Sequence, residues 1–255
     1  MALDKNMDFD KVAEFYDVQL QSGTFDLAFW VDVARRSAGP RLELMCGTGR
    51  ITCRILEAGL EIDGLDYSEG LLSVLRSKVP PAGPACRLHL ADARSFDLQR
   101  QYRLVFIGFH SIAEVIEDSD KQAVFKCVRN HLLSEGEFWL TAHNPKTRVA
   151  TLDGRLMDMG AFTLPQTGET FHVTGQFVHD PRTGIATGRQ VYACSREGQP
   201  TRTVELPMRF HLVEPAQLDS LLAGAGLTIA DRYGDYDRCG FDPQCSPFYI
   251  VRCSR

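Results

Sequence analysis

Short apolar segments alternate with longer amphipathic segments from residue 41 to residue 142, and this alternation constrains the fold more than any other feature of the chain. The apolar segments have the length and composition of buried strands, and the segments between them repeat apolar residues at helical spacing. Strands that alternate with helices form βαβ units, in which each helix crosses back over a parallel sheet. The pattern therefore predicts an α/β fold.

Two more strands are expected near the end of the chain. The full set of expected strands is residues 41–45, 61–65, 86–90, 102–108, 137–142, 228–233 and 248–253. Seven strands in this setting predict a Rossmann-like, doubly wound and mostly parallel sheet. Between residues 168 and 212 the pattern changes to three antiparallel strands joined by short polar turns.

These patterns divide the chain into three regions. Residues 1–40 are expected to form an N-terminal helical cap, and residues 41–160 and 213–255 a cofactor-binding Rossmann-like domain. Residues 161–212 are expected to form an antiparallel β insert before the last helix, acting as a lid or a dimerisation element. Exposed strand edges in the insert make a homodimer possible.

Charge and composition exclude several classes of protein. The chain has 33 acidic and 28 basic residues, whereas proteins that bind nucleic acids or anionic membranes usually carry a basic surplus, so neither partner is expected. No apolar run approaches the roughly 18 residues of a membrane span, and residues 1–10 are too polar for a signal peptide. The eight cysteines form no C-x-x-C pair, so no metal site is expected. We predict a cytoplasmic protein with reduced thiols.

A glycine turn, Cys46-Gly47-Thr48-Gly49, follows the first expected strand. Glycines allow a ligand to lie against the backbone, and the helix that follows offers free N–H groups. Tight turns need glycine in any case, but acidic residues at the same sheet edge strengthen the prediction of a ligand site. Asp66 and Asp92 end the second and third strands, where open α/β sheets bind ligands. Glu43 lies inside the first strand, where a carboxylate needs a partner.

Each of these acidic residues also has a purely structural interpretation. Asp66 could form an Asx turn before Ser68, and Asp92 could be a simple turn former. Glu43 could pair with Arg54. Because all three acidic residues fall at one edge of one sheet, a shared ligand site explains them better together than three separate structural roles do.

Residues 42–50, 64–68 and 91–93 together resemble the motifs of class I S-adenosylmethionine-dependent methyltransferases. The resemblance covers roughly residues 12–145 and the closing strands. The insert and the ending resemble small-molecule N-methyltransferases of the glycine or amino-sugar type. The resemblance implies transfer of a methyl group from S-adenosyl-L-methionine to a small-molecule acceptor by in-line displacement, with an amine nitrogen as the expected target.

The same resemblance implies roles for individual residues. Asp66 would hold the ribose hydroxyls and Asp92 the adenine amine, while Glu43 would face the amino-acid part of the cofactor. The other residues implied to bind the cofactor are Tyr16, Met45, Gly47, Gly49, Tyr67, Ala93, Phe109 and Ser111. Met45 stands where the family usually has glycine, so its side chain is expected to point away from the cofactor.

An amine acceptor must lose a proton before or during attack, so a nearby base would assist methyl transfer. The candidates lie after the fourth and fifth strands. His110 and His143 are the predicted catalytic residues, and Glu114 is a further candidate. A hydrogen-bonded position in the pocket wall explains each histidine at least as well.

Two other functions fit part of the sequence. Because Met45 replaces a glycine and no base is unambiguous, the chain could bind S-adenosylmethionine without methylating a substrate. The spacing from Gly47 to Asp66 also fits an NAD-dependent dehydrogenase, but Thr52 stands where the dinucleotide fingerprint needs its third glycine.

Overall fold

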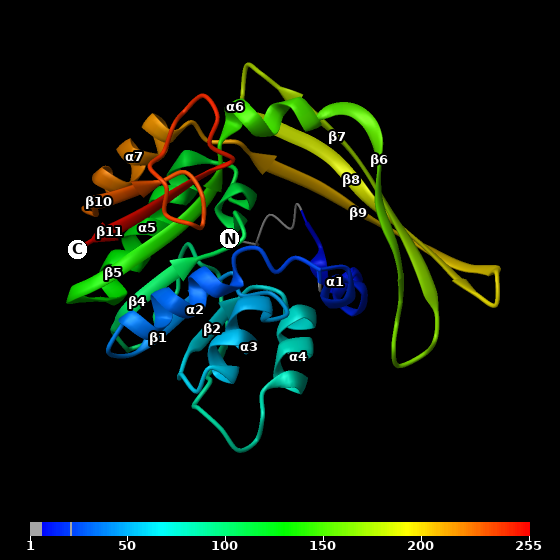
Figure 1. The fold of residues 1–255 in the computed structure, drawn as a ribbon, viewed down its shortest axis with the longest axis horizontal. Helices are drawn as coiled ribbons and strands as arrows, with labels where there is room; N and C mark the ends of the chain where they lie inside the picture. Colours follow the sequence, from blue (N-terminus) through cyan, green and yellow to red (C-terminus); the bar gives the residue numbers. More distant parts are fainter. Residues whose placement is uncertain (1–6, 21) are drawn as a thin grey trace.

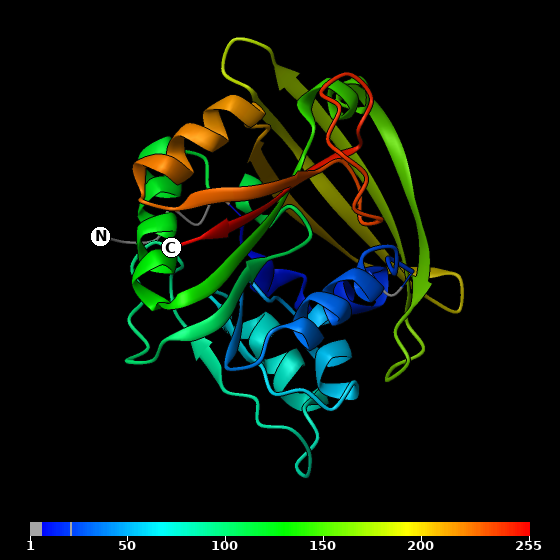
Figure 2. The same ribbon diagram turned by 60° about the vertical axis from the view of Figure 1, so that its left-hand side comes forward.

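The computed structural model describes residues 7–20 and 22–255, which fold into two sheets and the helices packed on them (Figures 1 and 2). The first six residues of the expected cap lie outside these ranges. The cap itself consists of the short 3-10 helix η1 (Phe9–Lys11) and the helices α1 (Ala13–Leu20) and α2 (Leu27–Arg36).

The larger sheet has seven strands in the order β10-β11-β5-β4-β1-β2-β3. Their bounds are β1 (Arg41–Leu44), β2 (Asp63–Asp66), β3 (Leu88–Leu90), β4 (Tyr102–Ile107), β5 (Leu132–His143), β10 (Thr228–Tyr233) and β11 (Phe248–Ser254). The strands from β3 to β5 are parallel, and β11 is antiparallel to both β5 and β10. The predicted α/β class and mostly parallel seven-stranded sheet are confirmed.

Helices cover both faces of this sheet. The helices α5 (Asp118–His131) and α7 (Pro215–Gly224) bury apolar residues against one face, and α2 and α3 (Arg50–Glu57) do so against the other. The helix α4 (Glu69–Lys78) begins at Ser68, whose hydroxyl accepts a hydrogen bond from the N–H of Leu71, as expected for an N-cap. The remaining helices are short: η2 (Ser111–Glu114), α6 (Pro145–Arg148) and η3 (Val149–Thr151). Within the described residues, no helix is both long and apolar enough to cross a membrane.

The β insert is a separate antiparallel sheet of four strands that extends beside the larger sheet (Figure 1). Its strands are β6 (Asp153–Thr163), β7 (Thr170–Asp180), β8 (Ile185–Arg196) and β9 (Gln199–His211). We predicted only the last three strands and placed the start of the insert at residue 161. The strand β6 was missed because its pairing with β7 shifts register twice, and these irregularities interrupt the alternation of apolar and polar residues.

The cap joins the insert to the domain. Phe15 of α1 packs on Phe171 and Tyr192 of the insert, with ring centroids 4.9 and 5.3 Å apart. Asp10 accepts hydrogen bonds from Ser68 Oγ (2.6 Å) and from the N–H of Gly70 (2.9 Å), which fixes the start of the cap on α4. These contacts hold the insert over the edge where β1, β2 and β3 end.

Candidate functional site

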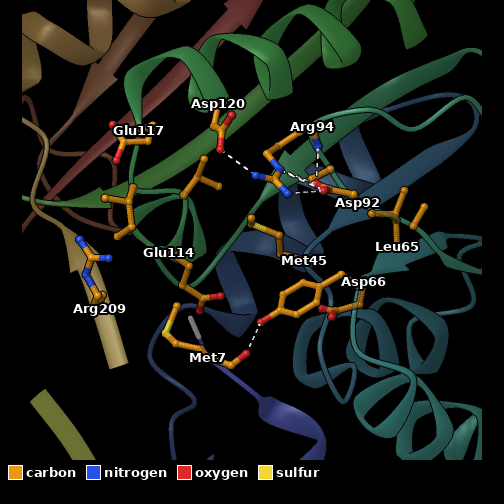
Figure 3. A pocket seen from close by; sticks show the side chains of 15 residues that line it. Met7, Met45, Leu65, Asp66, Asp92, Arg94, Glu114, Glu117, Asp120 and Arg209 are labelled. Carbon is orange, nitrogen blue, oxygen red and sulfur yellow. Dashed lines mark hydrogen bonds and ion pairs between the residues drawn. The ribbon is translucent and has the colours of Figure 1, made fainter. Parts of the chain in front are cut away.

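A pocket lies at the carboxyl ends of β1, β2 and β3, where an open α/β sheet binds its ligand (Figure 3). Its wall comes from the start of the described chain, three strand ends, the η2 region and the insert strand β9. The lining residues are Met7, Met45, Leu65, Asp66, Tyr67, Ala91, Asp92, Ala93, Arg94, Glu114, Val115, Ile116, Glu117, Asp120 and Arg209. Five of the residues predicted to bind a cofactor are therefore brought together in one wall: Met45, Asp66, Tyr67, Asp92 and Ala93.

The Asp66 carboxylate is anchored by the backbone on both oxygens. Oδ2 accepts a hydrogen bond from the N–H of Gly47 (2.8 Å), and Oδ1 accepts one from the N–H of Ser68 (2.9 Å). The Ser68 bond is the local turn that we considered as an alternative, but the Gly47 bond also ties Asp66 to the glycine turn. Burial raises the pKa of Asp66, against the opposing effect of these donors.

The glycine turn has left-handed backbone at Met45 (φ 57°), Gly47 (φ 55°) and Gly49 (φ 80°). Met45 thus adopts a left-handed backbone conformation that favours glycine. Its side chain lines the pocket, and the expectation that it points away from the cofactor stays a prediction. A Cβ atom at Gly47 would lie 3.9 Å from the ring of Tyr16, which places Tyr16 beside this turn.

The Asp92 carboxylate is bound by a neighbouring arginine. The Arg94 guanidinium donates to both carboxylate oxygens of Asp92, with Nη2 2.7 Å from Oδ2, and its Nη1 donates to Asp120 at 2.7 Å. Burial alone would raise the pKa of Asp92, but the hydrogen bonds from Arg94 outweigh burial and lower it. Asp92 is therefore an ionised, oriented carboxylate in the pocket wall. We did not predict Arg94 as a site residue, although its place two residues after Asp92 was a usable signal.

Glu43 is buried in β1 outside the pocket lining, with 4% of its surface exposed. Its carboxyl group accepts a hydrogen bond from the hydroxyl of Thr52. The alternative pairing with Arg54 is wrong, because Arg54 donates to the exposed Glu57 instead. Burial raises the pKa of Glu43 to about 8, so this residue is mostly protonated near neutral pH.

Glu114 ends η2, which begins at Ser111, and its side chain lines the pocket near Asp66, whereas Ser111 is not part of the lining (Figure 3). Among the residues that the structure describes, none makes a hydrogen bond or ion pair with the Glu114 carboxyl group. Burial and the nearby charge of Asp66 raise its pKa to about 8. Glu114 can therefore take up or release a proton close to neutral pH.

His110 and His143 stack on one another, with ring centroids 3.9 Å apart, and His110 also stacks on Phe248 at 4.8 Å. Burial lowers the pKa of both imidazoles, that of His143 to about 3, so both are neutral near pH 7. Neither lines the pocket, and their catalytic role stays a prediction. Phe109 also lies outside the lining, with the Arg50 guanidinium 4.3 Å from its ring centroid.

Two further wall residues have no recognisable signal in the sequence. Met7 comes from the chain before η1, and Arg209 comes from β9 of the insert. Neither belongs to a motif, because each reaches the pocket only through the packing of distant segments. Gly49 is also outside the lining and serves as the N-cap residue of α3.

Comparisons with known proteins agree with this geometry. Residues 42–136 match the model of a methyltransferase domain family. The chain is 30% identical over 141 residues to the protein YqeM of Bacillus subtilis (strain 168), which covers 54% of this chain and 56% of YqeM. It is 28% identical over 133 residues to the dTDP-3-amino-3,6-dideoxy-alpha-D-glucopyranose N,N-dimethyltransferase of Streptomyces fradiae, which covers 49% of this chain and 51% of that enzyme. The matches thus span about half the length of these relatives.

The fold is similar over nearly the whole chain to a solved structure. This is the crystal structure of an S-adenosylmethionine-dependent methyltransferase from Clostridium acetobutylicum, with a TM-score of 0.79, 18% identity, and coverage of 96% of this chain and 98% of that chain. The likeness includes the β insert as well as the parallel sheet. Residues 42–136 thus match a methyltransferase domain family, and the chain shares its fold with a solved S-adenosylmethionine-dependent methyltransferase, so the resemblance of the sequence motifs is confirmed.

Proposed function

We propose that the protein transfers a methyl group from S-adenosyl-L-methionine to the nitrogen of a small-molecule amine. The observation that carries the proposal is the Asp66 carboxylate, which two backbone N–H groups fix at the edge of the pocket that also contains Asp92 and Ala93. An oriented carboxylate at this strand end can accept both hydroxyls of a ribose. The Streptomyces fradiae relative, by its name an N,N-dimethyltransferase of an amino sugar, supports an amine acceptor.

The residues present fit this cofactor. Asp66 and Asp92 are carboxylates at neighbouring strand ends in the pocket wall, and the glycine turn is tied to Asp66 by the N–H of Gly47. When bound, the cofactor supplies a methyl group already activated on a sulfonium. Met45 adds an apolar surface between the two acidic residues (Figure 3). The chain's contribution is then mainly to hold two reactants in line, which can contribute about 7–11 kcal/mol.

Glu114 is the group that we assign to accept the proton of the amine. It lines the pocket, makes no hydrogen bond or ion pair with any described residue, and has a pKa raised to about 8. A base is most effective when its pKa lies near the working pH. His110 and His143 stay candidates, but both lie outside the pocket lining and hold their neutral form in a buried stack.

The proposal extends to the setting of the reaction. All eight cysteines are free thiols, which supports a cytoplasmic location, where thiols stay reduced. The insert supplies part of the pocket wall through β9, which supports its role as a lid. A homodimer through the insert edges stays a prediction, which sedimentation analysis would test.

Calorimetric titration with S-adenosylhomocysteine tests the cofactor site, with NAD as the control ligand. We expect micromolar binding of S-adenosylhomocysteine alone, and at least about tenfold weaker binding by Asp66→Asn, because the amide loses charged hydrogen bonds. Methyl transfer to an amine panel, followed by mass spectrometry, then tests the reaction. Absence of S-adenosylhomocysteine binding by the wild-type protein would contradict the proposed function.

A further inference from the structure

We infer that the methyl acceptor carries an anionic group, a phosphate-type group or a carboxylate, and that Arg209 binds it. This inference rests on the proposed function, because it assigns the second recognition element of the same pocket. Arg209 lies on β9, and its half-buried side chain lines the pocket together with Asp66 and Glu114 (Figure 3). The acceptor would thus be an amine and an anion in one molecule.

Arg209 lacks a partner in the part of the chain that the structure describes. Among those residues, no side chain or carbonyl accepts a hydrogen bond from its guanidinium, and no carboxylate pairs with it. The exposed Glu117 lies in the same wall but forms no ion pair with it. A guanidinium carries five N–H donors in a planar fork that matches a carboxylate or phosphate. Its N–H donors are free of protein partners among these residues, so an anion in the pocket could accept from them directly.

The other arginines nearby show that this state is unusual. Arg94, the second arginine of the pocket, is held by Asp92 and Asp120. Most other arginines of the insert also have carboxylate partners. These are Arg155 with Asp153, Arg182 with Asp180, Arg189 with Glu205, and Arg202 with Glu14 and Glu169. Arg209 differs because it faces the pocket.

The remaining charges of the wall select against a simple anion. The wall carries five carboxyl groups, on Asp66, Asp92, Glu114, Glu117 and Asp120. An anion would be repelled by the ionised carboxylates of this wall and attracted beside Arg209, whereas an amine can form a hydrogen bond with Glu114. In the view of Figure 3, Glu114 lies between Arg209 and Asp66, and all three line one pocket, so one ligand can contact both Arg209 and Glu114. A molecule that carries both an anionic group and an amine can interact favourably with Arg209 and with Glu114.

Anion binding by the protein saturated with S-adenosylhomocysteine tests this inference. The probes are inorganic pyrophosphate for phosphate-type groups and malonate for carboxylates, each titrated calorimetrically into wild type, Arg209→Gln and Arg209→Lys. Arg189→Gln is the matched control, because Arg189 lies on the same sheet in an exposed ion pair with Glu205. We expect one probe to bind wild type and the control alike, to bind the glutamine variant about tenfold or more weakly, and to be partly restored by lysine.

The outcomes separate this inference from the proposed function. If wild type binds S-adenosylhomocysteine but neither probe, or if Arg189→Gln weakens a probe as much as Arg209→Gln does, the inference is wrong and the methyltransferase proposal stands. If Arg209→Gln instead weakens S-adenosylhomocysteine, Arg209 binds the carboxylate of the cofactor and the inference is also wrong. The stronger of the two probes identifies the type of anionic group, so matched pairs of charged and neutral amines can then be compared as acceptors.

Discussion

Replacing Glu114 by glutamine should make the protein more stable and less active. The pKa of Glu114 is raised from an ordinary 4.5 to about 8, chiefly by burial and secondly by the charge of Asp66. A folded-state pKa above the unfolded value means that folding favours the protonated form. The stability is then complete below pH 4.5 and is lost as the pH rises toward 8. Glutamine has the same shape as the protonated acid and does not ionise, so the variant does not lose this stability as the pH rises.

The expected magnitude follows from the interval between these two values. Each pH unit between 4.5 and 8 lowers the free energy of unfolding of the wild type by about 1.4 kcal/mol. If Glu114 were fully buried, the free energies of unfolding of Glu114→Gln and wild type would differ by about 3 kcal/mol at pH 7. Part of the Glu114 side chain remains exposed. We therefore expect the free energy of unfolding of Glu114→Gln to exceed that of wild type by about 2 kcal/mol at pH 7. The difference should be small at pH 5.

Urea denaturation at several values between pH 5 and pH 8 measures this difference. Glu117→Gln is the matched control, because Glu117 is an exposed carboxylate of the same wall. A gap between Glu114→Gln and wild type that stays constant with pH, or reverses sign, would refute the reasoning. Methyl transfer by Glu114→Gln should fall by about 10²-fold if Glu114 is the base, while S-adenosylhomocysteine affinity is retained.

Three further substitutions test the glycine turn and the cap. Gly49→Ala should destabilise the protein by about 2–5 kcal/mol in urea denaturation, because the backbone is left-handed and a Cβ atom would overlap Leu75. Gly47→Ala should cost only about 1–2 kcal/mol, because its backbone is also left-handed but its Cβ atom would make only ordinary contacts. Equal losses for the two glycines would contradict the structure. Arg50→Ala should cost about 3–5 kcal/mol, because it leaves the fully buried Asp26 without its two hydrogen-bonded partners Nη1 and Nη2. A loss below about 1 kcal/mol, typical of an exposed pair, would show that this pair is solvated.

The sheet and the acidic edge of the pocket could be predicted because their signals are local. Alternating strands and helices fix the parallel sheet, and the end of a parallel strand fixes the edge on which Asp66 and Asp92 lie. The hydrogen bond from Gly47 to Asp66 joins two such local signals across neighbouring strands. Nothing beyond the strand ends and the turn was needed for this part of the site.

The rest of the site depends on packing that no local pattern encodes. His110 follows a strand end, as Asp66 does, but left-handed backbone at Phe109 and His110 precedes η2, which carries Glu114 to the pocket while His110 stacks on His143. From the sequence, Glu114, His110 and His143 were all possible bases, and their positions did not rank them. Their ranking required the burial of each side chain and the shape of the turn.

The origin of Arg209 and Glu114 in separate parts of the chain has a consequence for acceptor selection. Glu114 lies within residues 42–136, the segment that matches a methyltransferase domain family, whereas Arg209 belongs to the insert, outside that match. Under the proposed function, the chemistry of proton removal is then fixed by the domain and the choice of acceptor by the insert. Substitutions on the pocket-facing side of β9 should therefore change which amine is methylated while leaving cofactor affinity unchanged, because Asp66 and the glycine turn do not depend on that strand.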